Sequence, residues 1–280
     1  MCRGGRCMVC GEMSFNPIPV KDRNGNGYLC DLHKNSTESY YSKNTKKFGV
    51  EKVNGFTFGV EFETANSTEV GRIEMANMGY LPTHDDSLAW SGVEYKSPIY
   101  QGMNAIIKHC VSIGVLVNDS DISIDSDCGT HLHVGHSEHI NPVTMGYIRR
   151  FYHSLFIPLS NAIAADPAKA ARFWGRKFTY YASAIDTSSD PEEHRNFINL
   201  QHDYTIEFRL CKFQSGAQYQ NCVRFAKDVI TTIINNFIVH FNDTDYNTAK
   251  FKNQREYRKH QAEKTAKKIV MLYAKYTANI

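Results

Sequence analysis

Three segments of the sequence carry ionisable side chains at every second residue, with bulky apolar residues between them. The first holds Glu61 and Glu63, the second His131 and His133, and the third Glu207 and Arg209. Alternate side chains of an extended strand point to the same face, about 6 to 7 Å apart. Each segment is therefore predicted to be a strand with one apolar and one ionisable face.

If these faces converge in one sheet, they form a cluster of three carboxylates, two imidazoles and a guanidinium. Carboxylates packed so closely repel one another unless cations neutralise them. Oxygen ligands suit Mg²⁺, and Mn²⁺ also accepts histidine. Charges that alternate along one antiparallel strand can simply mark its solvent face, with Glu and Arg paired across strands. Three such strands in one chain favour a divalent-metal site.

Residues around these segments extend the candidate site. Gly129 would let a backbone or a ligand approach the His131 strand closely. Glu94 and Lys96 share a face of a further short strand, where they either edge the site or pair with each other. His136 and His139 are expected in a loop, and the spacing leaves the roles of His84 and His202 open.

The first thirty residues carry a different ligand pattern. Cys7 and Cys10 form a C-x2-C pair, and Cys30 and His33 form a C-x2-H pair after a loop rich in Gly and Asn. Two such pairs supply the four tetrahedral ligands of a structural zinc ion. With few apolar residues between the pairs, this segment is expected to need the metal to fold. Cys2 is a candidate substitute ligand.

The sequence contains neither a GxxxxGK[ST] loop nor a GxGxxG fingerprint. A bound nucleotide would therefore be held by metal ions and arginines, for which Arg172, Arg176 and Arg195 are candidates. No serine nucleophile elbow is present. Cys128 could be proposed as a nucleophile, but a cysteine near the start of a buried strand is more often structural.

Alternation and apolar spacing predict the elements that position these residues. Strands are expected at residues 55–64, 92–97, 128–135 and 203–210. Helices are expected at residues 103–117, 142–165, 217–241 and 248–278, and the sequence shows no internal repeat. Asn141 provides the N-cap of the second helix and Pro142 its first turn. This order indicates an α+β fold with a largely antiparallel sheet and flanking helices.

Composition limits the function classes. The chain has 280 residues, 42% of them hydrophobic and 22% charged, which excludes a small disulfide knot and a wholly disordered chain. The expected organisation is a zinc knuckle at 1–34, a linker at 35–50, a main domain at 51–245 and a basic helix at 246–280. Residues 249–280 hold nine Lys or Arg against two Glu, typical of a solvated helix surface or of docking to an acidic partner or nucleic acid.

Four motifs occur in an order that resembles the amidoligases, carboxylate-amine ligases of the glutamine synthetase-like fold. They are 59-GVEFE-63, 85-DDSL-88 followed by 92-GVEYKSP-98, 128-CGTHLHV-134 and 205-TIEFR-209. An amino-terminal cysteine module is also familiar in such proteins. The family usually has Asp-Gly-Ser where this chain has Asp85-Asp86-Ser87.

The resemblance implies a curved antiparallel sheet that binds ATP and two or three Mg²⁺ ions, and amide or isopeptide formation through an acyl phosphate. It implies that Arg209 contacts phosphate and that Glu94 is a further ligand or orients the amine. The implied metal ligands are Glu61, Glu63, Glu207 and either His131 or His133.

Two other functions compete with the ligase. His-x-His with carboxylates also suits a metal-dependent hydrolase. The zinc knuckle and the basic helix suit a module that binds nucleic acid or protein, but the chain lacks an aromatic-rich basic groove, so nucleic acid is not the expected partner. The expected partners are a carboxylate and an amine substrate. No apolar run approaches the ~20 residues that cross a bilayer, and no secretory signal is evident, so we expect a cytoplasmic protein.

Overall fold

The computed structural model describes residues 55–83, 88, 92–242, 251–278 and 280, together with the backbone of four short strands between residues 5 and 29. The chain divides into two compact units. The first comprises Met1–Val53, Gly59–Tyr100 and Val111–Thr130, and the second comprises Asn54–Phe58, Gln101–Cys110 and His131–Ile280.

The amino-terminal strands form two antiparallel pairs. These are β1 (Gly5–Arg6) with β2 (Met13–Ser14), and β3 (Ile18–Asp22) with β4 (Gly25–Leu29). The expected zinc ligands Cys7, Cys10, Cys30 and His33 lie outside the described residues. So do the expected boundaries near residues 34, 50 and 245, and the zinc module therefore stays a prediction.

The sheet of the first unit is antiparallel, as the order of the expected strands and helices predicted. The strand expected at 55–64 is β5 (Phe56–Thr64), whose residues from Gly59 onward belong to this unit, and the strand expected at 92–97 is β8 (Val93–Lys96). β8 pairs with β5 on one side and with β7 (Leu81–Thr83) on the other. Phe58, Val60 and Phe62 are buried, which confirms the apolar face of β5.

Smaller elements complete the first unit. β6 (Asn66–Ser67) pairs with β10 (Ile122–Ser123), and β9 (Tyr100–Gln101) lies before the next helix, α3. α2 (Glu69–Asn77) was not expected from the sequence, although Thr68 caps it by accepting a hydrogen bond from Gly71 N. This side-chain cap is the local signal for the helix start.

The sheet of the second unit is also antiparallel. β11 (Thr130–His136) pairs with β13 (Ile206–Phe208), which pairs with β12 (Ile198–Asn199). The strand expected at 203–210 is thus limited to three residues. His136, expected in a loop, is the last residue of β11.

Two of the helices expected from the sequence are each divided into two elements in the structure. They are α3 (Gly102–Asn118), α4 (Pro142–Arg150), α5 (Tyr152–Ala164), α6 (Pro167–Trp174), α7 (Gly216–Ile233), the π-helix η1 (Ile234–Ile238) and α8 (Gln254–Tyr276). The single helix expected at 142–165 is two helices, because Phe151 has a non-helical backbone with φ −114° and ψ 20°. Its ring lies edge-on to Phe237 and Phe241, so packing on η1 accompanies the break.

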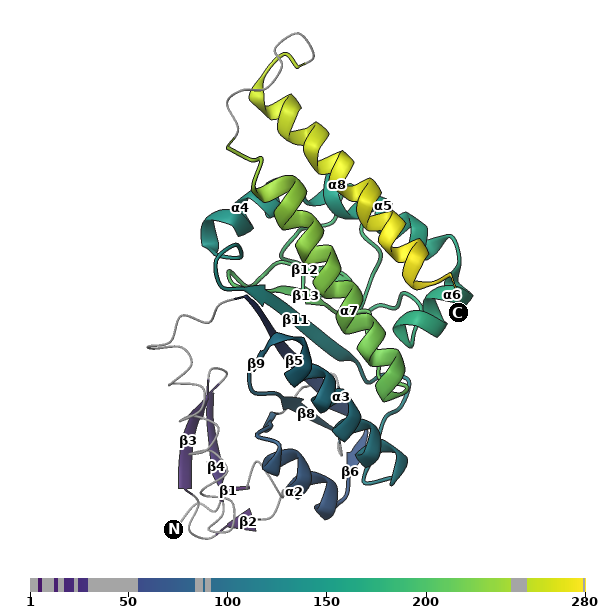
Figure 1. The fold of residues 1–280 in the computed structure, drawn as a ribbon. Helices are drawn as coiled ribbons and strands as arrows, with labels where there is room; N and C mark the ends of the chain where they lie inside the picture. Colours follow the sequence, from purple (N-terminus) through teal and green to yellow (C-terminus); the bar gives the residue numbers. More distant parts are fainter. Residues whose placement is uncertain are drawn as a thin grey trace. The chain divides into compact units, whose positions relative to one another are not determined.

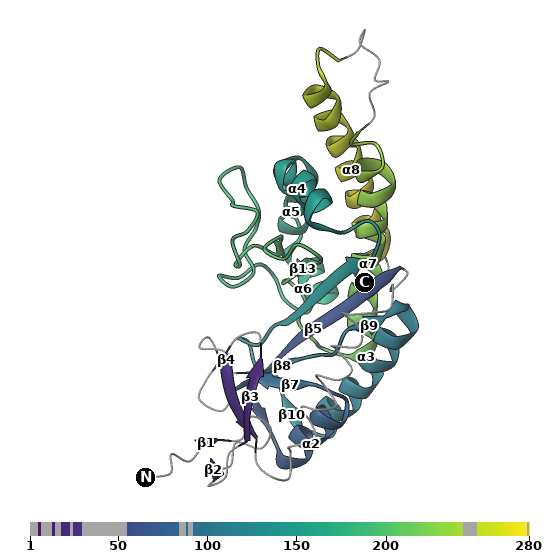
Figure 2. The same ribbon diagram turned by 90° about the vertical axis from the view of Figure 1, so that its left-hand side faces the viewer.

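Three helices of the second unit lie side by side. α8 runs along α5 and α7, as Figures 1 and 2 show from two directions. Its buried residues recur at helical spacing, among them Ala262, Ala266, Ile269 and Tyr273. Tyr273 meets Phe173 and Phe225 edge-on. The basic helix at the carboxyl end is therefore packed along one face and is part of this unit.

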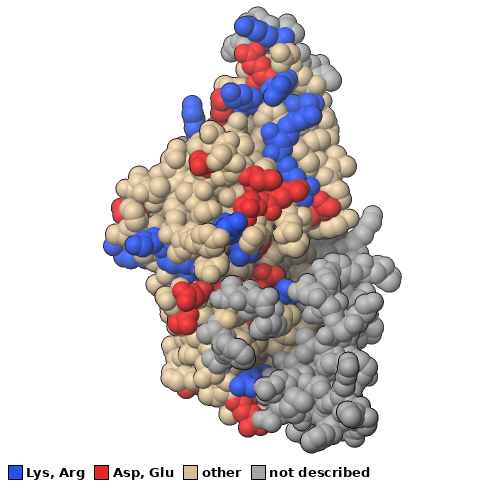
Figure 3. Space-filling view, turned by 180° about the vertical axis from the view of Figure 1, so that it is seen from behind, with Lys and Arg blue, Asp and Glu red and all other residues tan. Residues whose placement is uncertain are grey.

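The opposite face of α8 carries its charge. Lys259, Lys264, Lys267 and Lys275 are exposed, together with Glu256 and Glu263. Figure 3 shows Lys and Arg on the upper part of the molecule seen from behind, with Asp and Glu among them. This mixture is typical of a solvated helix surface.

The described residues thus form an α+β fold with mostly antiparallel strands and flanking helices. Among the helices described, none has both the length and the apolar character required to cross a bilayer.

Candidate functional site

The first unit gathers a carboxylate cluster, made of Glu61, Glu63, Glu94 and Lys96. The β5–β8 register sets Glu63 opposite Glu94 and Glu61 opposite Lys96. Residues directly opposite each other in an antiparallel pair project to the same face. The side chains expected to work together on these two strands are therefore neighbours.

Lys96 lies between two of the three carboxylates. Its Nζ is 3.7 Å from Glu61 Oε1 and 3.5 Å from Glu94 Oε2. Glu94, 6% exposed, also accepts a 2.7 Å hydrogen bond from Thr83 Oγ1. The pairing of Glu94 with Lys96 that the sequence allowed is present, and Lys96 also pairs with Glu61.

Glu63 is satisfied by the backbone. It is 5% exposed, and its Oε2 accepts a hydrogen bond from Gly129 N. Glu63 N donates to Gly129 O at 3.1 Å. Because Gly129 has no side chain, another residue can come close to its backbone, and here that residue is Glu63.

The second unit gathers a histidine–glutamate cluster, made of His131, His133, His202, Glu207 and Arg209. Glu207 lies opposite His133 in the β11–β13 register. Its Oε1 is 3.5 Å from His131 Nδ1 and 3.9 Å from His133 Nε2. His133, His202 and Glu207 each offer a ligand atom within 4.8 Å of the other two. The sequence-predicted residues of β11 and β13 are therefore together.

Glu207 is the buried centre of this cluster, at 2% exposure. Its Oε1 accepts a 2.7 Å hydrogen bond from Arg209 Nη1, and its Oε2 accepts one of 2.9 Å from Asn199 Nδ2. A buried carboxylate with a guanidinium and an amide on its two oxygens is held in one orientation. Its charge is neutralised within hydrogen-bonding distance.

Arg209 has donor capacity beyond Glu207. Its Nε is buried and has no hydrogen-bond partner among the residues that the structure describes. A buried N–H without a partner costs about 1 to 3 kcal/mol, which an anionic oxygen would recover. The residue therefore has the donor capacity for the phosphate contact that the amidoligase resemblance implies.

The other arginine candidates have different surroundings. Arg176, 8% exposed, donates from Nη2 to Arg209 O at 2.5 Å, so it braces the backbone of Arg209. Arg172 is exposed in the last turn of α6. Arg195 binds Glu193 at 3.2 Å and lies over the ring of Tyr180. The contacts of Arg176 and Arg195 are within the protein.

Cys128 has the character of a structural thiol. Burial is the main cause that raises its pKa, to about 12, and its Sγ lies 3.2 Å from Asp125 Oδ1. A thiol with such a pKa is almost entirely protonated at neutral pH and is a poor nucleophile. This agrees with the structural role favoured by its sequence position.

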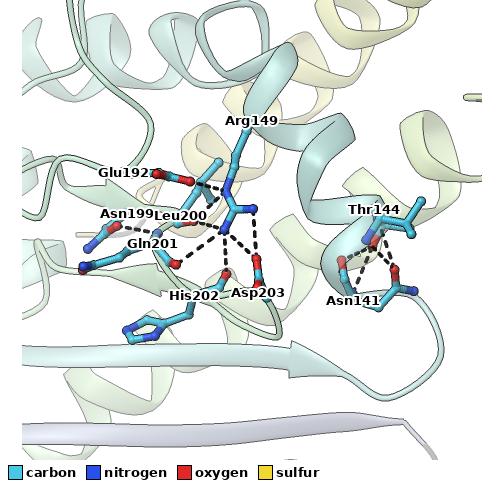
Figure 4. Close-up of polar contacts among 10 residues, drawn as sticks. Asn141, Thr144, Arg149, Glu192, Asn199, Leu200, Gln201, His202 and Asp203 are labelled. Atoms are coloured by element: carbon cyan, nitrogen blue, oxygen red, sulfur yellow. Dashed lines mark hydrogen bonds and ion pairs between the residues drawn. The ribbon is translucent and has the colours of Figure 1, made fainter. Parts of the chain in front are cut away.

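Sequence reasoning missed the groups that hold the second cluster. Asn199 lies in the two-residue strand β12, Arg149 in α4 and His202 in the loop between β12 and β13, and none of them belongs to a repeating pattern. Figure 4 shows Arg149 of α4 reaching the loop from Asn199 to Asp203. The same view shows Asn141 and Thr144 at the start of α4. Asn141 Oδ1 accepts hydrogen bonds from Val143 N and Thr144 N, which confirms the predicted cap.

Some expectations stay predictions. His84, Asp85 and Asp86 lie outside the described residues. That all three ionisable strand faces converge also stays a prediction, since the carboxylate cluster belongs to the first unit and the histidine–glutamate cluster to the second. In comparisons with known proteins, no protein-family model matches the chain, and no curated protein matches it significantly.

Proposed function

We propose that the protein is an ATP-dependent carboxylate-amine ligase of the glutamine synthetase-like kind, working with Mg²⁺ or Mn²⁺. The observation that carries the proposal is Glu207, buried beside two imidazoles and hydrogen-bonded to Arg209, whose Nε has no partner among the described residues. The ordered motifs that include these residues are the sequence support.

The residues fit the required groups by their donor chemistry. The oxygens of Glu61, Glu63 and Glu94 suit Mg²⁺, and Glu207 with His131 or His133 suits Mn²⁺. When bound, the metal ions shield phosphate charge, and ATP activates the acid as an acyl phosphate.

The protein's own groups would do the rest. Arg209 would direct Nε to a phosphate oxygen while Nη1 keeps Glu207 in place. Glu94, fixed by Thr83, would orient the amine or accept its proton. Lys96 would move from the carboxylates when a metal cation takes its place, because its distances of 3.5 and 3.7 Å allow only a loose ion pair.

The test is a titration of a non-hydrolysable ATP analogue with and without Mg²⁺. We expect binding that requires Mg²⁺ and that weakens in both Glu61→Gln and Glu207→Gln. The weakening should exceed the roughly 10- to 100-fold effect of losing an outer-shell partner. Glu74→Gln, at an exposed position of α2, is the matched control and should bind like the parent. Circular dichroism checks that each variant is folded.

A metal-dependent hydrolase is the second candidate, because imidazoles flank Glu207. It predicts hydrolysis that requires Zn²⁺ or Mn²⁺ and is indifferent to ATP. Nucleotide binding that is the same in the parent and in both cluster variants would count against the ligase.

A further inference from the structure

The loop between β12 and β13 brings a third histidine to Glu207. His202 lies on this loop, His133 on β11 and Glu207 on β13, and their ligand atoms are within 4.8 Å of one another. The rings of His133 and His202 have centroids 5.3 Å apart and planes at 64°. Donors around a tetrahedral zinc ion lie about 3.4 Å apart, so small side-chain rotations would bring the three donors to one ion.

Arg149 holds this loop on both sides of His202. Its Nε and Nη2 donate to Leu200 O at 2.9 and 2.7 Å, and both Nη atoms donate to Asp203 Oδ1 at 3.0 Å. Glu192 Oε1 lies 3.0 Å from Arg149 Nε. In Figure 4, His202 turns its carbonyl oxygen toward the guanidinium and its ring away from it. A rigid fork that binds two points of a loop limits where the residue between them can go.

The same loop orients the other ligands. Asn199 Oδ1 accepts from Gln201 N at 2.8 Å, which leaves Asn199 Nδ2 directed at Glu207. Thr205 Oγ1 is 3.5 Å from His133 Nδ1, while His133 Nε2 faces Glu207. An outer partner on one ring nitrogen, with the other nitrogen toward the ion, is the usual setting of a metal-binding histidine.

The close fit of the loop depends on Gly135 of β11. A Cβ at this position would lie 2.6 Å from Tyr204 O and 2.7 Å from Thr57 Oγ1. Any larger residue would therefore push back the loop that carries His202.

We propose that His133, His202 and Glu207 form a three-ligand site for a borderline divalent cation such as Zn²⁺ or Co²⁺. Two imidazoles and one carboxylate suit these ions better than Mg²⁺, which prefers oxygen ligands. Arg209 shares Glu207 Oε1 with the ion, so the affinity is lower than that of a carboxylate without a cationic partner. The inference rests on the proposed function only in taking His133 and Glu207 as metal ligands.

The test is a Co²⁺ titration of the full chain, followed by visible absorption. Bands from thiolate ligands lie in the near ultraviolet, and a Cys7→Ser/Cys10→Ser background removes any contribution from that pair. His202→Ala is expected to weaken Co²⁺ binding at least about tenfold, the lower limit for losing an outer-shell partner. His194→Ala is the matched control, because His194 lies before β12 with its side chain 64% exposed, and its loss should leave binding unchanged.

Arg149→Lys tests the positioning role of the loop clamp. Lysine keeps the charge but not the fork, so we expect weaker Co²⁺ binding and an unchanged spectrum at saturation, since the ligands are the same. Equal Co²⁺ affinity in the parent, His202→Ala and His194→Ala would overturn the proposed site. Titration of the ATP analogue in the same variants separates the two proposals. If the parent binds the nucleotide but shows no Co²⁺ site, only the proposed site is contradicted. If the parent binds Co²⁺ but no nucleotide, only the ligase is contradicted.

Discussion

The two units bury carboxylates in different ways. In the first, Lys96 lies 3.7 Å from Glu61 and 3.5 Å from Glu94, and Glu63 accepts a hydrogen bond from the backbone of Gly129. In the second, the single carboxylate of Glu207 has Arg209 at 2.7 Å and Asn199 at 2.9 Å. The first cluster offers three carboxylates as oxygen donors, whereas the second has one carboxylate, paired with Arg209, and is rich in imidazole. The difference indicates a preference for a hard cation in the first and for a borderline cation in the second.

The largest difference between the two clusters is expected when one carboxylate is removed from each. Glu207→Ala removes a carboxylate that is 2% exposed and leaves the partly buried guanidinium of Arg209 without it, which should cost about 3 to 5 kcal/mol of unfolding free energy. Glu61→Ala removes a side chain that is 21% exposed and loosely paired, and should cost less than about 1 kcal/mol. Urea denaturation of both variants without added metal measures the difference. Similar losses would mean that the clusters are equally dependent on their ion pairs.

Removing the ammonium group of Lys96 should strengthen metal binding at the carboxylate cluster. Lys96→Met deletes the cation with which Mg²⁺ competes. Mg²⁺ should therefore bind about tenfold more tightly, a gain of about 1.4 kcal/mol in binding free energy. Calorimetric titration with Mg²⁺ measures this, and Lys108→Met, at an exposed position of α3, is the control. An unchanged or weaker affinity in Lys96→Met would show that the carboxylate cluster does not bind Mg²⁺ at Lys96.

The smallest expected effect is in thiol chemistry, where the units should behave alike. Burial raises the pKa of Cys128 in the first unit and of Cys110 in the second to about 12. Because the thiolate is the reactive form, iodoacetamide should label neither residue in the folded protein near neutral pH. Peptide mapping by mass spectrometry with increasing urea checks this. Labelling of one cysteine before the other would show which unit opens first, and labelling without urea would contradict the burial argument.

The sequence was sufficient for the strands that position most candidate residues. Alternation of apolar and ionisable residues predicted β5, β8 and β11, because one face of each is packed and the other is polar. It was insufficient for lengths and breaks. Phe151 interrupts the helix expected at 142–165, and the strand expected at 203–210 is only Ile206–Phe208. Packing against other elements decides such ends, and a local pattern does not contain it.

The sequence by itself determined which side chains share a face, since a two-residue period follows from strand geometry alone. It thereby paired Glu61 with Glu63, His131 with His133 and Glu207 with Arg209. Only the tertiary structure decided which charges neutralise which. Lys96 reaches Glu61 across a strand pair, and Arg149 holds the loop of His202 from a helix about fifty residues earlier in the chain. Such contacts depend on distances between segments far apart in the sequence, which no local period encodes.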